Sequence, residues 1–398
     1  MLSKEMINLG QVRSVIREMF EYGNKRAAEI GRENVYDFSL GNPSVPAPKI
    51  VDETIIKLIQ EEDSVKLHGY TSAPGDMAVR QAVADRLNAD YGTTFSGNNI
   101  YFTTGAAAAL SITFKAISEP NDEIIVFAPF FPEYKVFIEN AGAKMNVVKC
   151  RESDFQIDFD ALRSAMNRNV KAVVINSPCN PSGVVFSKET IEMLASVLSG
   201  YEKEYGHPIF LISDEPYREL VYDNIEVPFV PNFYNNTIVC YSFSKSLSLP
   251  GERIGYILIS NKSADPSLIF DAVAGAGRAL GYVCASSLFQ RVIPHCMGMT
   301  ADIEVYKKNR DILCEALKEY GYELPRPDGA FYLFIKALES DAARFCENAK
   351  KFELLLVPSD SFGYEGYVRI SYCVSTEQII NSLPAFKKLA DGYKNGEF

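Results

Sequence analysis

One stretch of the chain combines residue types suited to carbonyl chemistry: Tyr241–Tyr256, with the sequence YSFSKSLSLPGERIGY. Apolar runs at 237–240 and 254–259 flank a polar loop, and both runs are typical of buried strands. A lysine at the end of a buried strand is costly to desolvate in its charged form. Burial would therefore lower the pKa of Lys245 and leave a neutral amine that can attack a carbonyl carbon.

The residues around Lys245 are suited to holding a phosphate group. Ser242, Ser244 and Arg253 offer two hydroxyls and a guanidinium within the same stretch, and these groups commonly donate to phosphate oxygens. An amine nucleophile beside a phosphate site predicts a phosphorylated aldehyde held as a Schiff base, which is pyridoxal 5′-phosphate. The alternative is a solvated polar loop with an ordinary lysine.

A second polar cluster, ISDEPY, ends the apolar run 209–212. Carboxylates are disfavoured at the end of a buried strand unless they have a partner. Asp214 beside a pyridine nitrogen would keep that nitrogen protonated, so that the ring acts as an electron sink. Tyr217 could donate to the phenolic oxygen of the same ring. The alternative is a strand terminus with helix-capping acids.

Three further strand ends carry polar or aromatic residues. TTGAAAA at 103–109 starts a helix with small residues, whose free N–H groups can bind phosphate; a tightly packed Ala-rich helix is the alternative. Phe131 in APFFPEY could stack on a flat heterocycle, although core packing is the more frequent use of Phe. Asn180 in NSPCNPSG could donate to a phenolate, although these residues also form ordinary turns.

Arg369 lies within an otherwise apolar run, YVRISY at 367–372. Its planar fork of donors suits bidentate binding of a carboxylate. The alternative is an arginine on an edge strand that faces the solvent.

The elements that position these residues alternate between strands and helices from residue 98 onward. Strands are predicted at 100–103, 123–127, 144–148, 172–175 and 209–212, with helices at 105–115, 133–141, 159–166 and 188–203. This alternation predicts a mostly parallel sheet covered on both faces, with ligands at the carboxyl ends of its strands. Residues 264–317 are expected to be largely helical with a long connector, and a smaller α+β domain follows from residue 322. An amphipathic helix with Val12, Ile16 and Phe20 is expected near the N-terminus.

Composition narrows the class of protein. The chain has 398 residues, 47% of them hydrophobic, a net charge of −11 and a pI of about 5.0. This acidic balance argues against nucleic-acid or anionic-membrane partners. The 8 cysteines are expected to be buried thiols of a cytoplasmic protein. The 3 histidines are scattered, so no metal site is predicted, and neither a signal peptide nor a membrane-spanning run is expected.

Together and in this order, the motifs resemble the fold-type I pyridoxal-phosphate enzymes, most closely the class I/II aminotransferases of the aspartate aminotransferase family. The resemblance covers essentially the whole chain and rests on SLGNPSVPAP, GYTSAPG, TTGAAAAL, APFFPEY, NSPCNPSG, ISDEPY, SFSKSLSLPGERIGY and YVRISY. It implies a mostly parallel α/β sheet of the seven-stranded type and a smaller α+β domain. The expected domains are 1–46 (N-terminal arm and helix, packed with the small domain), 47–290 (large, cofactor-binding) and 291–398 (small).

The resemblance also implies roles for single residues. Lys245 would be the Schiff-base lysine and proton carrier, Asp214 the partner of the pyridine nitrogen, and Arg369 the clamp for the substrate α-carboxylate. The other implied site residues are Asn180 and Tyr217 at the phenolic oxygen, Phe131 as the stacking ring, Gly41 and Asn180 near the substrate, Gly105, Ala106, Ala107, Ser242, Ser244 and Arg253 around the phosphate, and Tyr70, which would reach the phosphate of the other subunit. The chain departs from the family in having alanines where a hydroxyl residue is frequent in TTGAAAAL.

The expected activity is transfer of an amino group from an L-amino acid to a 2-oxo acid by a ping-pong mechanism, in a cytoplasmic homodimer with shared active sites. Aspartate is a candidate substrate, although no second arginine for its side-chain carboxylate is fixed by a motif. A carbon–sulfur β-lyase on the same fold is the alternative enzyme. A transcriptional regulator with an aminotransferase-like sensor domain is a third class, which the lack of a basic segment disfavours.

Overall fold

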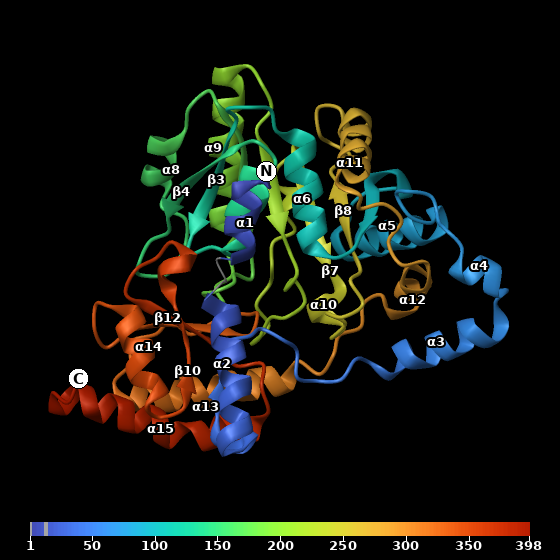
Figure 1. Cartoon of the computed structure of the whole chain (residues 1–398). Coiled ribbons are helices and arrows are strands. Elements are labelled where there is room, and N and C mark those ends of the chain that lie inside the picture. Colours follow the sequence, from blue (N-terminus) through green and yellow to red (C-terminus); the bar gives the residue numbers. More distant parts are fainter. Residues whose placement is uncertain (1, 12–14) are drawn as a thin grey trace.

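The computed structural model describes residues 2–11 and 15–398, and a seven-stranded sheet is the largest feature of this described part (Figure 1). The strands lie in the order β2-β8-β7-β6-β5-β3-β4. β8 runs antiparallel to β2 and β7, and the other neighbours are parallel, which confirms the mostly parallel sheet predicted from the sequence. The strands are β2 (Ile100–Thr103), β3 (Glu123–Ala128), β4 (Lys144–Lys149), β5 (Val170–Asn176), β6 (Phe210–Asp214), β7 (Thr237–Ser242) and β8 (Gly255–Ile259).

Helices cover both faces of this sheet. Successive strand residues point to opposite faces, so on β5 Ala172 and Val174 pack with α6, α7 and α11, whereas Val173 and Ile175 pack with α8 and α9. A third core joins α3, α5 and α12 to β2, β7 and β8. The helices are α3 (Lys49–Glu61), α4 (Ser64–His68), α5 (Met77–Tyr91), α6 (Ala106–Ile117), α7 (Glu133–Asn140), α8 (Phe159–Ala165), α9 (Lys188–Tyr205), α10 (Phe243–Ser246), α11 (Pro266–Leu280) and α12 (Ser287–Cys296).

A second group of elements surrounds a three-stranded antiparallel sheet with the order β11-β12-β9. Figure 1 shows this group in orange and red below the large sheet. Its apolar core includes side chains from α13, α14 and α15. The elements are α13 (Glu304–Tyr320), β9 (Tyr332–Lys336), α14 (Ala342–Lys350), β10 (Leu354–Leu355), β11 (Val357–Pro358), β12 (Tyr367–Ser371) and α15 (Thr376–Asn395).

The N-terminal segment contacts this second group. α1 buries no side chain, whereas α2 packs Met19 against Leu355, and β1 pairs in parallel with β10. Val12 of the predicted amphipathic helix lies outside the described residues. The bounds are Lys4–Gln11 for α1, Val15–Ile30 for α2 and Tyr36–Asp37 for β1, with short 3₁₀ helices at Arg32–Asn34, Gly97–Asn99, Val230–Asn232 and Ser359–Phe362.

Two segments differ from the sequence prediction. Lys245 lies on the short helix α10 and not in a loop, because the hydroxyl of Ser242 caps this helix by accepting a hydrogen bond from the Ser244 N–H. The segment 264–317 is helical, but it is divided into α11, α12 and α13, with Gly281 ending α11 in the left-handed conformation. The domain boundaries after residues 46 and 290 stay predictions.

Candidate active site

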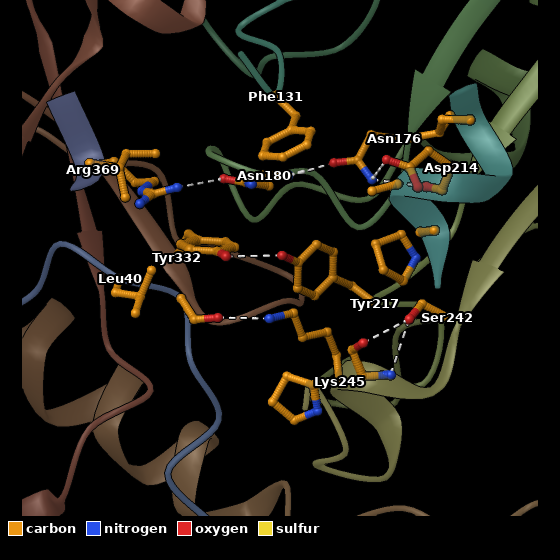
Figure 2. Close-up of a pocket in the computed structure, with 18 of the residues that line it drawn as sticks. Leu40, Phe131, Asn176, Asn180, Asp214, Tyr217, Ser242, Lys245, Tyr332 and Arg369 are labelled. Carbon is orange, nitrogen blue, oxygen red and sulfur yellow. Dashed lines mark hydrogen bonds between the residues drawn. The ribbon is translucent and has the colours of Figure 1, made fainter. Parts of the chain in front are cut away.

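A cavity of about 280 Å³ lies where the carboxyl ends of β5, β6 and β7 face β9 and β12 (Figure 2). Loops after parallel strands share one edge of a sheet, so motifs far apart in sequence meet there. The predicted site residues that line the cavity are Gly41, Ala106, Ala107, Phe131, Asn180, Asp214, Tyr217, Ser242, Ser244, Lys245, Arg253 and Arg369. The lining residues that were not predicted are Ile16, Leu40, Leu110, Asn176, Pro216, Pro250 and Tyr332.

Lys245 projects from α10 into this cavity. Its Nζ donates a 2.7 Å hydrogen bond to the carbonyl oxygen of Gly41. Loss of hydration lowers the pKa of Lys245 from 10.5 to about 8, and the positive charges of Arg253 and Arg369 act in the same direction. A substantial fraction of the amine is therefore neutral near pH 8, which is the form that attacks carbonyl carbon.

Asp214 ends β6 and is held from one side by two neighbours. The hydroxyl of Tyr134 donates to its Oδ2 at 2.6 Å, and the Asn176 amide donates to its main-chain oxygen at 2.8 Å. The other carboxylate oxygen, Oδ1, is buried with no hydrogen-bond partner. Buried acceptors in folded proteins almost always have a partner, so this oxygen is available to a donor that enters the cavity.

Burial raises the pKa of Asp214 from 3.8 to about 7, the hydrogen bond from Tyr134 opposes the rise, and the charge of Glu215 adds to it. A protonated ring nitrogen next to Oδ1 would supply both a donor and a positive charge, and each favours the carboxylate form. The orphaned oxygen therefore fits the pyridine nitrogen of pyridoxal phosphate.

The start of α6 presents an anion site formed by main-chain groups. Gly105 precedes the helix with φ +94°, and a Cβ at this position would lie 3.0 Å from an Arg253 nitrogen. No side chain caps this end of α6, while Ala106 and Ala107 line the cavity. Uncapped N–H groups at a helix N-terminus attract a phosphate, and the absence of larger side chains lets it approach closely.

Hydroxyls and a guanidinium surround the same region. The Oγ atoms of Ser242 and Ser244 lie 2.8 Å apart, both in the cavity wall. Arg253 is exposed, and one of its terminal nitrogens donates to the carbonyl of Pro250 at 2.9 Å. These three side chains and the start of α6 therefore form one cluster of donors, and their role in binding a phosphate stays a prediction.

Phe131 follows β3 and lines the cavity as a partly buried ring. It meets Tyr134 edge to face, with 5.7 Å between centroids and 87° between planes. This contact leaves ring surface available to the cavity, where Figure 2 shows Phe131 above Asn180.

Arg369 occupies β12, the central strand of its sheet, and its side chain is 2% exposed. One terminal nitrogen donates to Oδ1 of Asn180 at 3.1 Å and the other to the carbonyl of Ser39 at 2.5 Å, while Nε has no hydrogen-bond partner. Burial lowers the pKa of this guanidinium. The alternative of a solvent-facing edge arginine is therefore wrong, and a buried cation in a cavity wall suits a carboxylate ligand.

Three residues that hydrogen-bond to predicted site residues were not predicted from the sequence. Tyr332 hydrogen-bonds to Tyr217 with 2.9 Å between the hydroxyl oxygens, while Tyr134 and Asn176 position Asp214. The last two lie in motifs that already pointed to the site, and their polar groups beside buried strand ends were an available signal. Tyr332 had no such signal, because it belongs to an apolar strand in another sheet.

Tyr70 does not line the cavity within one chain. It is 99% exposed and belongs to the segment 69–75 that precedes α5. Its predicted role in a neighbouring subunit stays a prediction.

Three further features of the described residues concern metal ions, membranes and disulfide bonds. They contain no group of three or more His, Cys, Asp or Glu residues that could hold a metal ion, and none of their helices has the length and apolar character to cross a membrane. The cysteines are free, and most of them are buried.

Comparisons with known proteins identify the family of this chain. The family model "Aminotransferase class I and II" matches residues 33–385. The crystal structure of an amino transferase from Eubacterium rectale superposes with a TM-score of 0.97 at 57% identity, covering 98% of this chain and 99% of that one. An aspartate aminotransferase from Thermotoga maritima is 30% identical, over 88% of this chain and 90% of its own length. A probable N-acetyl-LL-diaminopimelate aminotransferase from Bacillus subtilis is 30% identical over 88% of each chain.

Proposed function

The chain belongs to the class I and II aminotransferases, which depend on pyridoxal phosphate, and we propose that its cavity around Lys245 transfers an amino group from an L-amino acid to a 2-oxo acid. One observation carries the proposal. A lysine with its pKa lowered to about 8 and a carboxylate oxygen without a partner, on Asp214, open on the same cavity. The cofactor needs both, one for its aldehyde carbon and one for its ring nitrogen.

The residues present fit the cofactor. Lys245 would bond to its aldehyde carbon, and Oδ1 of Asp214 would accept from its ring nitrogen. Asn180 and Tyr217 would donate to its ring oxygen, and Phe131 would cover the ring. Its phosphate would bind to the remaining donors at Gly105, Ala106, Ala107, Ser242, Ser244 and Arg253. When bound, pyridoxal phosphate supplies an electron sink for the pair released at the substrate Cα.

The chain's own groups then orient the substrate and move its proton. Arg369, held by Asn180 and the Ser39 carbonyl, would bind the substrate α-carboxylate next to Gly41. The Lys245 amine, once released by the substrate, would accept the proton from Cα. It would return that proton to the cofactor carbon that receives the amino group, and the 2-oxo acid would reverse these steps. The two half-reactions give a ping-pong mechanism.

The proposed assembly is a homodimer. Tyr70 is almost fully exposed in one chain, and an exposed aromatic on a Gly/Pro-rich segment is suited to contact another subunit. The proposal places its hydroxyl on the cofactor phosphate of the partner, so each site needs two chains. A cytoplasmic location suits the free cysteines, because that compartment keeps thiols reduced.

The donor is proposed as a class only. Aspartate is named for the Thermotoga relative and is a candidate donor here. The β-lyase alternative is not favoured, since the relatives are named as aminotransferases.

A panel of amino donors with 2-oxoglutarate or pyruvate tests the proposal. We expect at least one donor to convert the bound cofactor to its amine form, and a 2-oxo acid to restore the first spectrum. Lys245→Ala is the matched control, and it should lose both changes and the adduct trapped by borohydride. Release of pyruvate and ammonia without an added 2-oxo acid would instead identify a lyase. A cofactor that stays unchanged with every donor would contradict the proposal.

A further inference from the structure

Tyr332 lies between Tyr217, which is proposed to contact the cofactor, and Arg369, which is proposed to bind the substrate. It lies on β9 with 3% of its surface exposed, and Figure 2 shows its phenol directed at that of Tyr217, with Arg369 on one side and Lys245 on the other. Tyr217 lies in the turn after β6 of the large sheet, whereas Arg369 lies on β12 of the three-stranded sheet. Tyr332 contacts both.

The bond between the two hydroxyls holds a single proton. Burial raises the pKa of Tyr332 to about 12 and that of Tyr217 well above its ordinary value, so both phenols are protonated at neutral pH. Their oxygens lie 2.9 Å apart, and either can donate. If Tyr217 donated to Tyr332, it would have no proton left for the cofactor ring oxygen. If Tyr332 donates, the proton of Tyr217 is free to point at that oxygen.

The ring of Tyr332 has a second contact. The guanidinium carbon of Arg369 lies 4.7 Å from the ring centroid, within the range of a cation–π interaction. Arg369 pairs with Phe334 across β12 and β9, so Tyr332, two residues from Phe334, lies diagonally on the same face of the sheet. The aromatic face therefore supports the cation proposed to bind the substrate carboxylate.

A third contact fixes the hydroxyl in place. A Cβ on Gly41 would lie 2.0 Å from the Tyr332 hydroxyl oxygen, so the phenol packs directly on the Gly41 backbone. The carbonyl of the same glycine accepts the hydrogen bond from Lys245. With Gly41 on one side and Arg369 over its ring, Tyr332 has little freedom to turn its hydroxyl away from Tyr217.

We propose that Tyr332 is a positioning residue of the transamination site: its hydroxyl donates to Tyr217, which directs the Tyr217 proton to the cofactor ring oxygen, and its ring holds Arg369 in place for the substrate carboxylate. The proposal rests on the proposed function, because it needs a cofactor and a carboxylate substrate in this cavity. It separates two roles of one side chain, which two substitutions can measure independently.

Tyr332→Phe removes the hydroxyl and keeps the ring. Without the donated bond, Tyr217 is a weaker donor and stabilises negative charge on the cofactor ring oxygen less well. The proton shared between that oxygen and the Lys245 nitrogen then has a higher pKa, so it is lost only at higher pH. We expect the pH midpoint of the visible absorption of the holoenzyme to rise by about 0.5 to 1 unit, in line with the loss of one hydrogen bond, while the donor KM stays within about twofold.

Tyr332→Leu removes the ring as well. We expect the same rise in the midpoint and, in addition, about tenfold weaker binding of the α-methyl analogue of the best donor, since a cation–π contact is lost. Tyr322→Phe is the matched control. Tyr322 is a buried tyrosine of the same apolar core, it donates to the Phe386 carbonyl at 3.0 Å, and it lies outside the cavity. This control should shift neither quantity.

Each other outcome overturns a defined part of the proposal. A Tyr332→Phe holoenzyme with an unmoved midpoint would show that Tyr332 does not donate to Tyr217. A raised KM in the same variant would show that its hydroxyl contacts the substrate directly. Wild-type protein that binds pyridoxal phosphate but transaminates no donor would refute the proposed function alone, because the midpoint still measures the hydrogen bond. Wild-type protein that binds no pyridoxal phosphate would refute both.

Discussion

The hydroxyl of Tyr134 donates a 2.6 Å hydrogen bond to Oδ2 of Asp214 and leaves Oδ1 open to the cavity. The two residues are far apart in sequence, and both side chains are buried. This bond stabilises the ionised carboxylate against the effect of burial. Tyr134 thus influences both the charge of Asp214 and which of its oxygens stays open to the cavity.

We expect Tyr134→Phe to raise the pKa of Asp214 by about one to two units, because a hydrogen bond to a charged group is lost. The carboxyl would then stay protonated to higher pH and would stop stabilising a protonated ring nitrogen. In a plot of kcat against pH, the fall in kcat on the acidic side should move to higher pH, and cofactor affinity should fall. Tyr234→Phe serves as the control, since Tyr234 is equally buried but donates to the Ile209 carbonyl outside the cavity. A fall in kcat on the acidic side at the wild-type pH in Tyr134→Phe would count against this role.

Asp214→Asn should have two separate effects, one on the pH dependence of stability and one on the rate of turnover. Because burial raises the pKa of Asp214 to about 7, the folded protein without cofactor binds more protons than the unfolded chain between about pH 4 and pH 7. Its stability should therefore fall as pH rises through this window, by on the order of 4 kcal/mol at most. The asparagine variant should lack this loss, yet turn over about a thousandfold more slowly, since the electron sink is weakened.

Urea unfolding of both apoproteins at pH 5 and pH 8 measures the first effect, and single-turnover kinetics measure the second. The raised pKa of Asp214 would be contradicted if the difference in unfolding free energy between the wild-type apoprotein and Asp214→Asn were the same at pH 5 and pH 8. Near-normal turnover of the variant would remove Asp214 from the mechanism.

Arg369→Lys keeps the positive charge but loses the planar fork that bonds to Asn180 and to the Ser39 carbonyl. We expect the KM of the amino donor to rise by about one to two powers of ten, at a cost of about 1.5–3 kcal/mol for a bond to a charged group. Cofactor binding should be unchanged, and its absorption spectrum is the internal control. A variant that loses cofactor while its residual holoenzyme keeps the wild-type KM would assign Arg369 a structural role.

Much of this site could be predicted from sequence because its residues follow strand ends. Asp214 and Asn180 are separated along the chain, yet parallel strands bring their carboxyl ends to the same edge of the sheet. Tyr332 could not be predicted in this way, since its contacts depend on how two sheets pack together. Tyr134 lies in a motif that pointed to the site, but its bond to Asp214 depends on how α7 packs on the large sheet. The helix at Lys245 was missed because four residues, FSKS, carry no periodicity.

Tyr70 is the proposed site residue whose predicted role depends on a second chain. If its hydroxyl binds the partner's cofactor phosphate, Tyr70→Phe should weaken cofactor retention by about one to two powers of ten without a change in thermal stability. Dialysis followed by the absorbance of retained cofactor measures this. Tyr282→Phe is a suitable control, because Tyr282 is also an exposed tyrosine and lies outside the cavity of its own chain.

Subunit exchange gives the sharper test of shared sites. Tyr70→Ala and Lys245→Ala homodimers should each be inactive, because every site in them carries a defect. In a mixed dimer, one site would contain both defects and the other site neither. Mixing should therefore restore up to half of the activity per mixed dimer, in proportion to the fraction of mixed dimers seen by native mass spectrometry. If mixed dimers form and activity does not return, each site is built within a single chain, and the exposed Tyr70 has another purpose.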